Sequence, residues 1–299
     1  MTTCIEPTSS QAIAMSFVCP VDHAPLLEQG DSLQCATCRR EFPIVGGVAD
    51  FRDEAPRRWA EAQRYEMQFW KQDESTPQKR EAMYRNGVRT ITSRVQPHRP
   101  IEPSSRVLQI GTAGHAEIHY FDAAVKCAAE PLAVELSRHG MLVHGDVRWA
   151  CTMGERLPFA DGAFTHAVLA NMIDHVAQPD AVLAEVWRCL EPGGVAYVTC
   201  NVSAAPLLPI FRALSGLRLG YFRGHLWFFT GRGLEERARR TGFEIASATT
   251  YRAPKRWQGW QGGLQRTLRP LLVSPHMMVL RKLEQTHAAS PRGYTAQHG

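Results

Sequence analysis

Four side chains near the N-terminus have the types and spacing that bind a metal ion. Cys35 and Cys38 are separated by two residues, so two thiolates on one tight turn can bind a single Zn²⁺ ion. Cys19 lies upstream and is followed by Asp22 and His23, and imidazole is the more usual companion of thiolates. The sequence therefore predicts a structural zinc site formed by Cys19, His23, Cys35 and Cys38, with Asp22 as the alternative fourth ligand.

A second reactive group is the pair Asp174 and His175, which follows an apolar stretch at 165–170. A carboxylate or a neutral imidazole within hydrogen-bond reach can accept the proton of a nucleophile that does not ionise unaided. We therefore predict that Asp174 and His175 are catalytic. The alternative for His175 is that it only caps and packs this turn.

The stretch that would position a ligand is an apolar segment over 106–110. It leads into a turn that includes Gly111 and Gly114, where the backbone can come close to a bound molecule. The next apolar segment, 132–136, is predicted to be the second strand. Glu135 in that segment is placed to accept hydrogen bonds from a ribose diol.

Strands and helices alternate along the chain after this point. The predicted strands cover 106–110, 132–136, 149–152, 165–170, 194–200, 243–250 and 276–281, and a helix is predicted over 179–190. Such alternation implies a parallel sheet with right-handed crossovers, whose ligands lie beyond the carboxyl ends of the strands. The segments 203–230 and 257–270 are predicted to be insertions.

Three further blocks follow the glycine turn: GERLPFADGAF at 154–164, NMIDHV at 171–176 and LEPGGVAYVT at 190–199. Their order resembles class I S-adenosylmethionine (SAM) methyltransferases, in particular the small-molecule branch that includes the ubiquinone-pathway C-methyltransferases. The resemblance implies an α/β fold with a Rossmann-like, seven-stranded methyltransferase sheet that binds SAM. It also implies the cofactor-binding residues, which are Gln109, Gly111, Thr112, Ala113, Gly114, Glu135, Leu136, Met153, Gly154, Glu155 and Asn171.

Four positions around the cofactor depart from the pattern of that family. Gln109 takes the place of an acid, Ala113 and His115 take the places of glycines, and Met153 takes the place of an acid beside the adenine. Met153 can pack on the adenine ring but cannot hydrogen-bond its exocyclic amine. That hydrogen bond is then left to Glu155 or to the backbone.

The block at 19–48, with its Phe-Pro-Ile-Val-Gly-Gly tail, resembles the zinc-ribbon module that activates several methyltransferases and is fused to many bacterial ones. It implies a small N-terminal zinc-ribbon-like module, either with a structural zinc or as a metal-free relic. We expect a disordered N-terminus at 1–16, the module at 17–52, a helical lid and linker at 53–103, the methyltransferase domain at 104–284 and a flexible tail at 285–299. In the lid, Tyr65, Phe69 and Trp70 are candidates to line a substrate pocket.

These features together predict a SAM-dependent methyltransferase that acts on a small metabolite or a glycan- or lipid-linked intermediate, with O-methylation slightly favoured. Arg212, Arg218 and Arg223 indicate an anionic group on the substrate, and His119 and His225 are further candidates to contact it. One alternative is an rRNA guanine methyltransferase, because bacterial enzymes of that kind also carry an N-terminal zinc ribbon. Another is a methyltransferase-fold protein without methyl transfer, either a partner subunit or a protein with altered SAM chemistry.

Composition narrows the classes of partner. The net charge of +5, from 34 basic and 29 acidic residues, does not favour nucleic acid. No apolar run reaches the roughly 18 residues that span a bilayer, and the N-terminus lacks the pattern of a signal peptide. We therefore expect a cytoplasmic protein, in which the eight cysteines are metal ligands or core residues rather than disulfides. The sequence gives no prediction of the oligomeric state.

Overall fold

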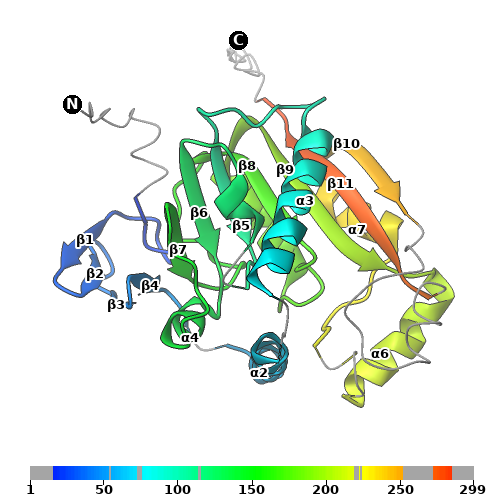
Figure 1. The fold of residues 1–299 in the computed structure, drawn as a ribbon, viewed down its shortest axis with the longest axis horizontal. Coiled ribbons are helices and arrows are strands. Elements are labelled where there is room, and N and C mark those ends of the chain that lie inside the picture. Colours follow the sequence, from blue (N-terminus) through cyan, green and yellow to red (C-terminus); the bar gives the residue numbers. More distant parts are fainter. Residues whose placement is uncertain are drawn as a thin grey trace, which may run out of the picture.

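The computed structural model describes residues 16–53, 55–72, 76–113, 116–218, 222, 224–251 and 272–284, without the side chains of Phe69 and Trp70. Its centre is one sheet with the strand order β1-β2-β3-β4-β7-β6-β5-β8-β9-β11-β10. Figure 1 shows this sheet with the N-terminal strands at one edge and β10 and β11 at the other.

The main part of the sheet has seven strands. They are β5 (Arg106–Ile110), β6 (Val125–Ala129), β7 (Val147–Cys151), β8 (Phe164–Ala170), β9 (Leu190–Val202), β10 (Phe243–Thr250) and β11 (Ser274–Lys282). Neighbours from β7 through β6, β5 and β8 to β9 are parallel, whereas β11 is antiparallel to both β9 and β10. The Rossmann-like α/β sheet predicted from the sequence is confirmed, in a mixed form.

The strand order places a ligand crevice at a defined position. The chain runs outward from β5 to β6 and β7 on one side, and then returns to β8 and β9 on the other side. The order therefore reverses between β5 and β8, and in open α/β sheets ligands bind beyond the carboxyl ends of the strands at this point.

Two apolar layers hold the helices against the sheet. Within β5, Val107 packs in the layer that includes Ile91 and Val95 of α3 (Pro77–Val95). Leu108 and Ile110 point to the opposite layer, which includes residues of α5 (Pro179–Cys189) and α7 (Gly231–Arg240). This alternation is the two-residue period of a strand buried on both faces, and it explains why Val107, Leu108 and Ile110 of β5 are all apolar. In Figure 1, α3 crosses the near face of the sheet.

The prediction of a strand over 132–136 is wrong. That segment forms α4 (Ala133–Arg138), and the second strand of the core is β6, which ends at Ala129. Pro131 ends the strand because it has no N–H to give to the ladder. The helix begins where Ala133 donates its N–H to the carbonyl of Glu130. Most of β6 and the residues Ala133, Val134 and Leu136 of α4 are buried, so apolar character alone does not distinguish the two elements.

The N-terminal segment extends the core sheet. Its strands are β1 (Leu26–Gln29), β2 (Ser32–Cys35), β3 (Glu41–Val45) and β4 (Val48–Asp50), and β4 pairs in parallel with β7. Phe17 and Phe51 lie 5.1 Å apart between ring centroids, and Phe17 lies 5.7 Å from Phe159 of the core. The module therefore shares the apolar layer of the main sheet instead of having a separate core.

Two helices lie along the edge at which the parallel strands end. They are α2 (Arg57–Lys71) and α6 (Leu208–Gly216), and Figure 1 shows them below the arrowheads of β6 and β9. α6 and the 3₁₀ helix η2 (Ala205–Leu207) belong to the predicted insertion at 203–230. The predicted insertion at 257–270, the N-terminus and the C-terminal tail lie outside the described residues. Among the described helices, none has the length and apolar character to cross a bilayer.

Candidate functional site

The turn after β5 has the tight backbone that close approach of a ligand requires. Gly111 has a φ of +72°, and a Cβ at this position would lie 2.7 Å from Met172 Cβ, so only glycine fits. Ala113 also has a positive φ, of 51°. Gly114 and His115 lie outside the described residues.

Gln109 is buried and already engaged. Its Nε2 donates to Glu117 Oε2 at 2.8 Å, and its Oε1 accepts from the backbone N–H of Ile118 at 2.8 Å. Both partners belong to the 3₁₀ helix η1 (Glu117–Tyr120). We therefore assign Gln109 to holding η1 against the sheet rather than to the cofactor.

A residue that sequence reasoning missed, Glu130, closes the glycine turn. It follows directly after β6 and is 5% exposed. Its Oε2 accepts from the backbone N–H groups of Thr112 and Ala113 at 2.8 and 2.9 Å, and its Oε1 accepts from Leu132 N–H at 2.9 Å. The acid at the end of the second strand is thus Glu130, and it faces the turn after β5. Its distance from the first turn, about twenty residues, is the signal that could have found it.

Glu135 was predicted as this strand-end acid, and the structure corrects that placement. Glu135 lies on α4, where both carboxylate oxygens accept from Arg52 Nη1 at 2.8 and 2.9 Å. Leu136, next to it, is fully buried in the core. Arg52 also donates to the carbonyl of Pro131 at 3.2 Å and to both oxygens of Asp50. The N-terminal module therefore fastens the β6–α4 turn that carries Glu130.

The predicted adenine-side residues lie after β7. Gly154 is buried, and a Cβ there would lie 3.3 Å from Ile110 and Val182, so a larger side chain would disturb the core. Met153 is half-buried. Glu155 Oε1 accepts from the N–H of Gln178, the residue before α5, at 2.9 Å. This carboxylate therefore stabilises the start of α5.

Asn171 directly follows β8 at the same edge of the sheet. It has a φ of 55°, and its Oδ1 accepts from Asn201 Nδ2 at 2.8 Å. Its backbone N–H donates to Thr199, on the neighbouring strand β9. The side chain is exposed, so it is free to contact a ligand in the crevice between β5 and β8.

The structure brings Asp174 and His175 together with His225. Asp174 is 2% exposed, and its backbone carbonyl accepts from the N–H groups of Leu226 and Trp227. Asp174 Oδ1 lies 3.9 Å from His175 Nε2, and Oδ2 lies 3.5 Å from His225 Nε2. The two imidazole rings lie 4.4 Å apart. His225 comes from the insertion after β9, which explains why the sequence did not join it to the pair.

Burial and neighbouring charges set the electrostatics of this edge. Burial raises the pKa of Asp174, and Glu66 on α2 adds to the rise while His175 opposes it. Burial lowers the pKa of His175, but the charges of Asp174 and Glu66 together with the Gly224 carbonyl outweigh it, and the pKa is raised. Burial also raises the pKa of Glu130, against three backbone N–H donors. Glu66 is therefore close enough to both Glu130 and Asp174 to raise their pKa values, and this gathering of acidic groups favours a cationic ligand.

A cavity of about 320 Å³ lies between α2 and α6. Arg58, Glu61, Arg64, Tyr65, Ser215 and Arg218 are among the residues that line it. Arg58 Nη2 donates to Ser215 Oγ at 2.7 Å, and Ser215 Oγ donates to the carbonyl of His225 at 2.8 Å. The cavity thus adjoins the Asp174 centre. Of the predicted arginines, Arg218 lines it, whereas Arg223 and the side chains of Phe69 and Trp70 lie outside the described residues.

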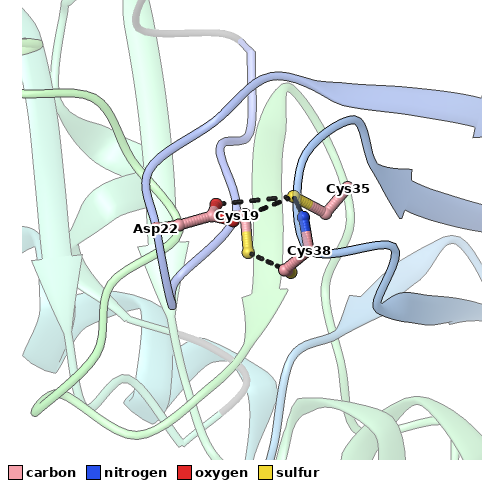
Figure 2. A group of neighbouring side chains, drawn as sticks. All are labelled: Cys19, Asp22, Cys35 and Cys38. Carbon is pink, nitrogen blue, oxygen red and sulfur yellow. Dashed lines mark hydrogen bonds between the residues drawn. The ribbon is translucent and has the colours of Figure 1, made fainter.

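Figure 2 shows the cluster of thiols in the N-terminal module, where Cys19, Asp22, Cys35 and Cys38 point toward one another. Cys19 Sγ lies 3.7 Å from Cys38 Sγ, and Cys35 Sγ lies 3.4 Å from both oxygens of Asp22. Two sulfurs bound tetrahedrally to one Zn²⁺ at about 2.3 Å would lie about 3.7 Å apart, so the donor set fits zinc. The fourth member is Asp22 and not the predicted His23. His23 is exposed to solvent, and its backbone has a φ of 56°.

Residues 108–198 match the family described as a methyltransferase domain. Over 48 residues the chain is 44% identical to the mitochondrial 2-methoxy-6-polyprenyl-1,4-benzoquinol methylase of Drosophila melanogaster, which is 16% of each chain. Over 66 residues it is 41% identical to the demethylmenaquinone methyltransferase of Parafrankia sp. (strain EAN1pec), which is 22% of this chain and 26% of that one. The chain therefore matches about a quarter or less of the length of these relatives. An uncharacterized methyltransferase of Mycobacterium avium (strain 104) is 28% identical over 57% of this chain and 74% of its own.

Solved structures share the fold at low identity. One is the complex between the Haloferax volcanii Trm112 methyltransferase activator and a protein assigned as a methyltransferase, with a TM-score of 0.51 and 14% identity over 78% of this chain and 100% of the matched one. Another is phosphoethanolamine N-methyltransferase 2 of Haemonchus contortus, with a TM-score of 0.50 and 16% identity over 67% of this chain and 53% of that one. The chain carries a methyltransferase domain of the class I, SAM-dependent kind.

Proposed function

We propose that the protein transfers the methyl group of SAM to a small molecule that carries an anionic group. The observation that carries this proposal is the crevice between β5 and β8, where Glu130 binds the backbone of the glycine turn. The match of residues 108–198 to a methyltransferase domain supports it independently. The short matches to the benzoquinol and menaquinone enzymes favour the ubiquinone-pathway-like branch.

In this proposal SAM lies across the glycine turn. Gly111, Thr112 and Ala113 face its methionine half, and Glu130 has the ribose-binding role that was predicted for Glu135. Met153 packs against the adenine, as predicted from its position after β7. The sulfonium is the cation that the carboxylates of this edge attract.

Methyl transfer requires an in-line approach of the acceptor to the sulfonium, and the acceptor's proton must be removed. Asp174 and His175 are the proposed catalytic residues, because they follow β8 at the edge where Glu130 follows β6. O-methylation remains the favoured reaction, since a hydroxyl is the acceptor that most needs such a centre.

The cavity between α2 and α6 supports an anionic substrate. Within the described residues, Arg64 has no carboxylate partner, and Arg58 has only the hydroxyl of Ser215. Guanidinium groups bind carboxylates and phosphates through paired hydrogen bonds. An anion held here would place the rest of the substrate toward His225, whose carbonyl binds Ser215.

The test is a methyl-transfer assay with isotope-labelled SAM and pairs of small molecules that differ only in one carboxylate or phosphate. We expect transfer to the anionic member of a pair. The double variant Arg58→Ala/Arg64→Ala should raise KM more than it lowers kcat. Arg57→Ala is the matched control, because its side chain lies on the same helix and is 90% exposed. Equal transfer to both members of each pair would sink the anionic-substrate proposal.

We also propose that Cys19, Asp22, Cys35 and Cys38 hold a structural zinc, and that residues 17–52 act as a built-in activating module. The fit of the donor set supports the metal, and the Arg52 contacts to Glu135 and Pro131 support the coupling to the methyltransferase domain. A cytoplasmic location remains part of this proposal. Elemental analysis of protein purified without added metal tests the zinc.

A further inference from the structure

We propose that Asp174, His175 and His225 form a second metal site, which binds one divalent transition-metal ion at the acceptor side of the crevice. The site is distinct from the thiol cluster of the N-terminal module. Binding of the ion stands on the geometry of these three residues alone, whereas its role in catalysis rests on the proposed methyl transfer.

The three side chains converge on one point. One ligand atom from each lies within 4.8 Å of the others, with the two nitrogen-to-oxygen distances at 3.5 and 3.9 Å. Both distances are too long for N–H···O hydrogen bonds, which are about 2.7–3.2 Å. Donors that share one ion at about 2.0–2.2 Å lie about 3–3.5 Å apart. The two distances to Asp174 are close to this range, and the two imidazole nitrogens lie within 4.8 Å of each other, so small side-chain rotations would close the cluster around an ion.

The hydrogen bonds of His175 leave its Nε2 available as a metal ligand beside Asp174. His175 Nδ1 lies 3.0 Å from the carbonyl oxygen of Gly224, and a carbonyl only accepts, so Nδ1 carries the hydrogen. When the ring is neutral, Nε2 carries the lone pair and lies 3.9 Å from Asp174 Oδ1. That oxygen is buried and has no hydrogen-bond partner. A cation between the two satisfies both groups, and a ring nitrogen anchored to a carbonyl is the usual outer support of a metal-bound histidine.

The surroundings favour a cation over an empty cluster. Asp174 is almost fully buried, and among the described residues the basic side chains within 4 Å of its carboxylate are those of His175 and His225. Glu66 of α2 adds a second negative charge close enough to act on both Asp174 and His175. The thiol of Cys200 hydrogen-bonds the Asp174 carboxylate, but Oδ1 stays without a partner. A buried carboxylate with an unsatisfied oxygen is costly, and metal coordination is one of the ways in which proteins stabilise it.

Two imidazoles and one carboxylate suit Zn²⁺, Fe²⁺ or Mn²⁺, and three protein ligands leave positions open for water or a substrate oxygen. An ion here would bind the acceptor hydroxyl and lower its pKa, so that its proton passes to solvent. The oxygen lone pair then forms the O–CH₃ bond while the S–CH₃ bond breaks, and its electron pair stays on sulfur as the neutral thioether of S-adenosylhomocysteine.

The experiment is a titration of chelator-treated, full-length protein with Co²⁺, followed by visible absorption and elemental analysis. Thiolates give intense charge-transfer bands with Co²⁺, whereas nitrogen and oxygen ligands give only weaker ligand-field bands. We expect each chain to bind one Co²⁺ ion that shows only ligand-field bands, in addition to any Co²⁺ ion that the thiols bind. Asp174→Asn and His225→Gln should each lower the affinity for that ion by at least about tenfold. His144→Gln, at an exposed histidine, is the control and should leave it unchanged.

Three outcomes decide the proposal. Co²⁺ bound only with thiolate bands overturns the site, as does full retention of the second ion in His225→Gln. Loss of that ion in both ligand variants, with the thiolate bands kept, supports it. The proposed function is tested separately by titration with SAM. Metal binding without SAM binding would support the metal site but contradict its role in methyl transfer. Methyl transfer at full rate in metal-free protein would contradict only the catalytic role of the ion.

Discussion

The substitution Glu130→Gln tests the reassigned cofactor acid. The carboxylate accepts three backbone hydrogen bonds, from Thr112, Ala113 and Leu132. A glutamine has one oxygen in place of two, so at least one N–H must face the new NH₂ group. Each hydrogen bond to a charged group contributes about 1.5–3 kcal/mol. The amide avoids the cost of burying a charge, and we therefore expect a net loss of about 2 kcal/mol in the free energy of unfolding.

The same substitution should weaken SAM binding at least about tenfold, because it loosens the turn and removes the charge-assisted acceptor for the ribose. The assays are denaturant unfolding and calorimetric titration with SAM. Glu135→Gln is the matched control: its carboxylate binds Arg52 on the far side of the turn, and the amide still accepts one hydrogen bond. We expect its SAM affinity to stay within about twofold of wild type. Unchanged affinity in Glu130→Gln, together with a loss in Glu135→Gln, would refute this reasoning and restore the assignment made from the sequence.

Three further predictions follow from other parts of the structure. Arg52→Ala removes contacts to Asp50, Glu135 and the Pro131 carbonyl, so it should lower the free energy of unfolding by about 1–2 kcal/mol and also weaken SAM binding. Thermal unfolding and calorimetric titration measure the two effects. Arg40→Ala, at an exposed ion pair, is the control and should change neither quantity. Burial lowers the pKa of His166 to about 4 from its ordinary 6.5. The neutral ring of His166 therefore contributes about 3 kcal/mol to the free energy of unfolding above pH 6.5, and this contribution is lost as the pH falls toward 4. The free energy of unfolding, measured across that range, should decline less steeply in His166→Gln than in wild type. Chelator treatment should release the ion of the thiol cluster and expose strands β1 to β4 to hydrogen exchange, while equal protection with and without chelator would argue for a metal-free relic.

Much of the fold follows from the sequence because apolar runs and turn signals coincide. β5 and β8 are mainly apolar segments that end at Gly111 and Asn171, and their predicted ranges agree with the structure to within a residue. β6 was missed because Lys126, Cys127 and two alanines carry little strand signal, while residues 132–136, which lead into α4, are apolar apart from Glu135. Register against neighbours, and not local composition, decides which of two buried segments joins the sheet.

The functional sites were less accessible from sequence because they are made by tertiary contacts. Asp22 replaces His23 in the thiol cluster because its side chain accepts the N–H of Ala24, which turns the carboxylate toward Cys35. The arginine cavity joins two helices that lie about 150 residues apart in the chain. His225 reaches Asp174 only because the backbone of the next two residues binds the carbonyl of Asp174. None of these pairings leaves a periodic signal.

Calorimetric titration of the purified wild-type protein with SAM and with S-adenosylhomocysteine tests the central claim most directly. The crevice at Gly111 and Glu130 predicts that both ligands bind in the micromolar range with one site per chain. SAM should bind more tightly than its product, because only SAM brings a sulfonium to the acidic edge formed by Glu66, Glu130 and Asp174. Absence of binding by either ligand to well-folded protein would contradict the account and would favour a partner-subunit role for the methyltransferase fold.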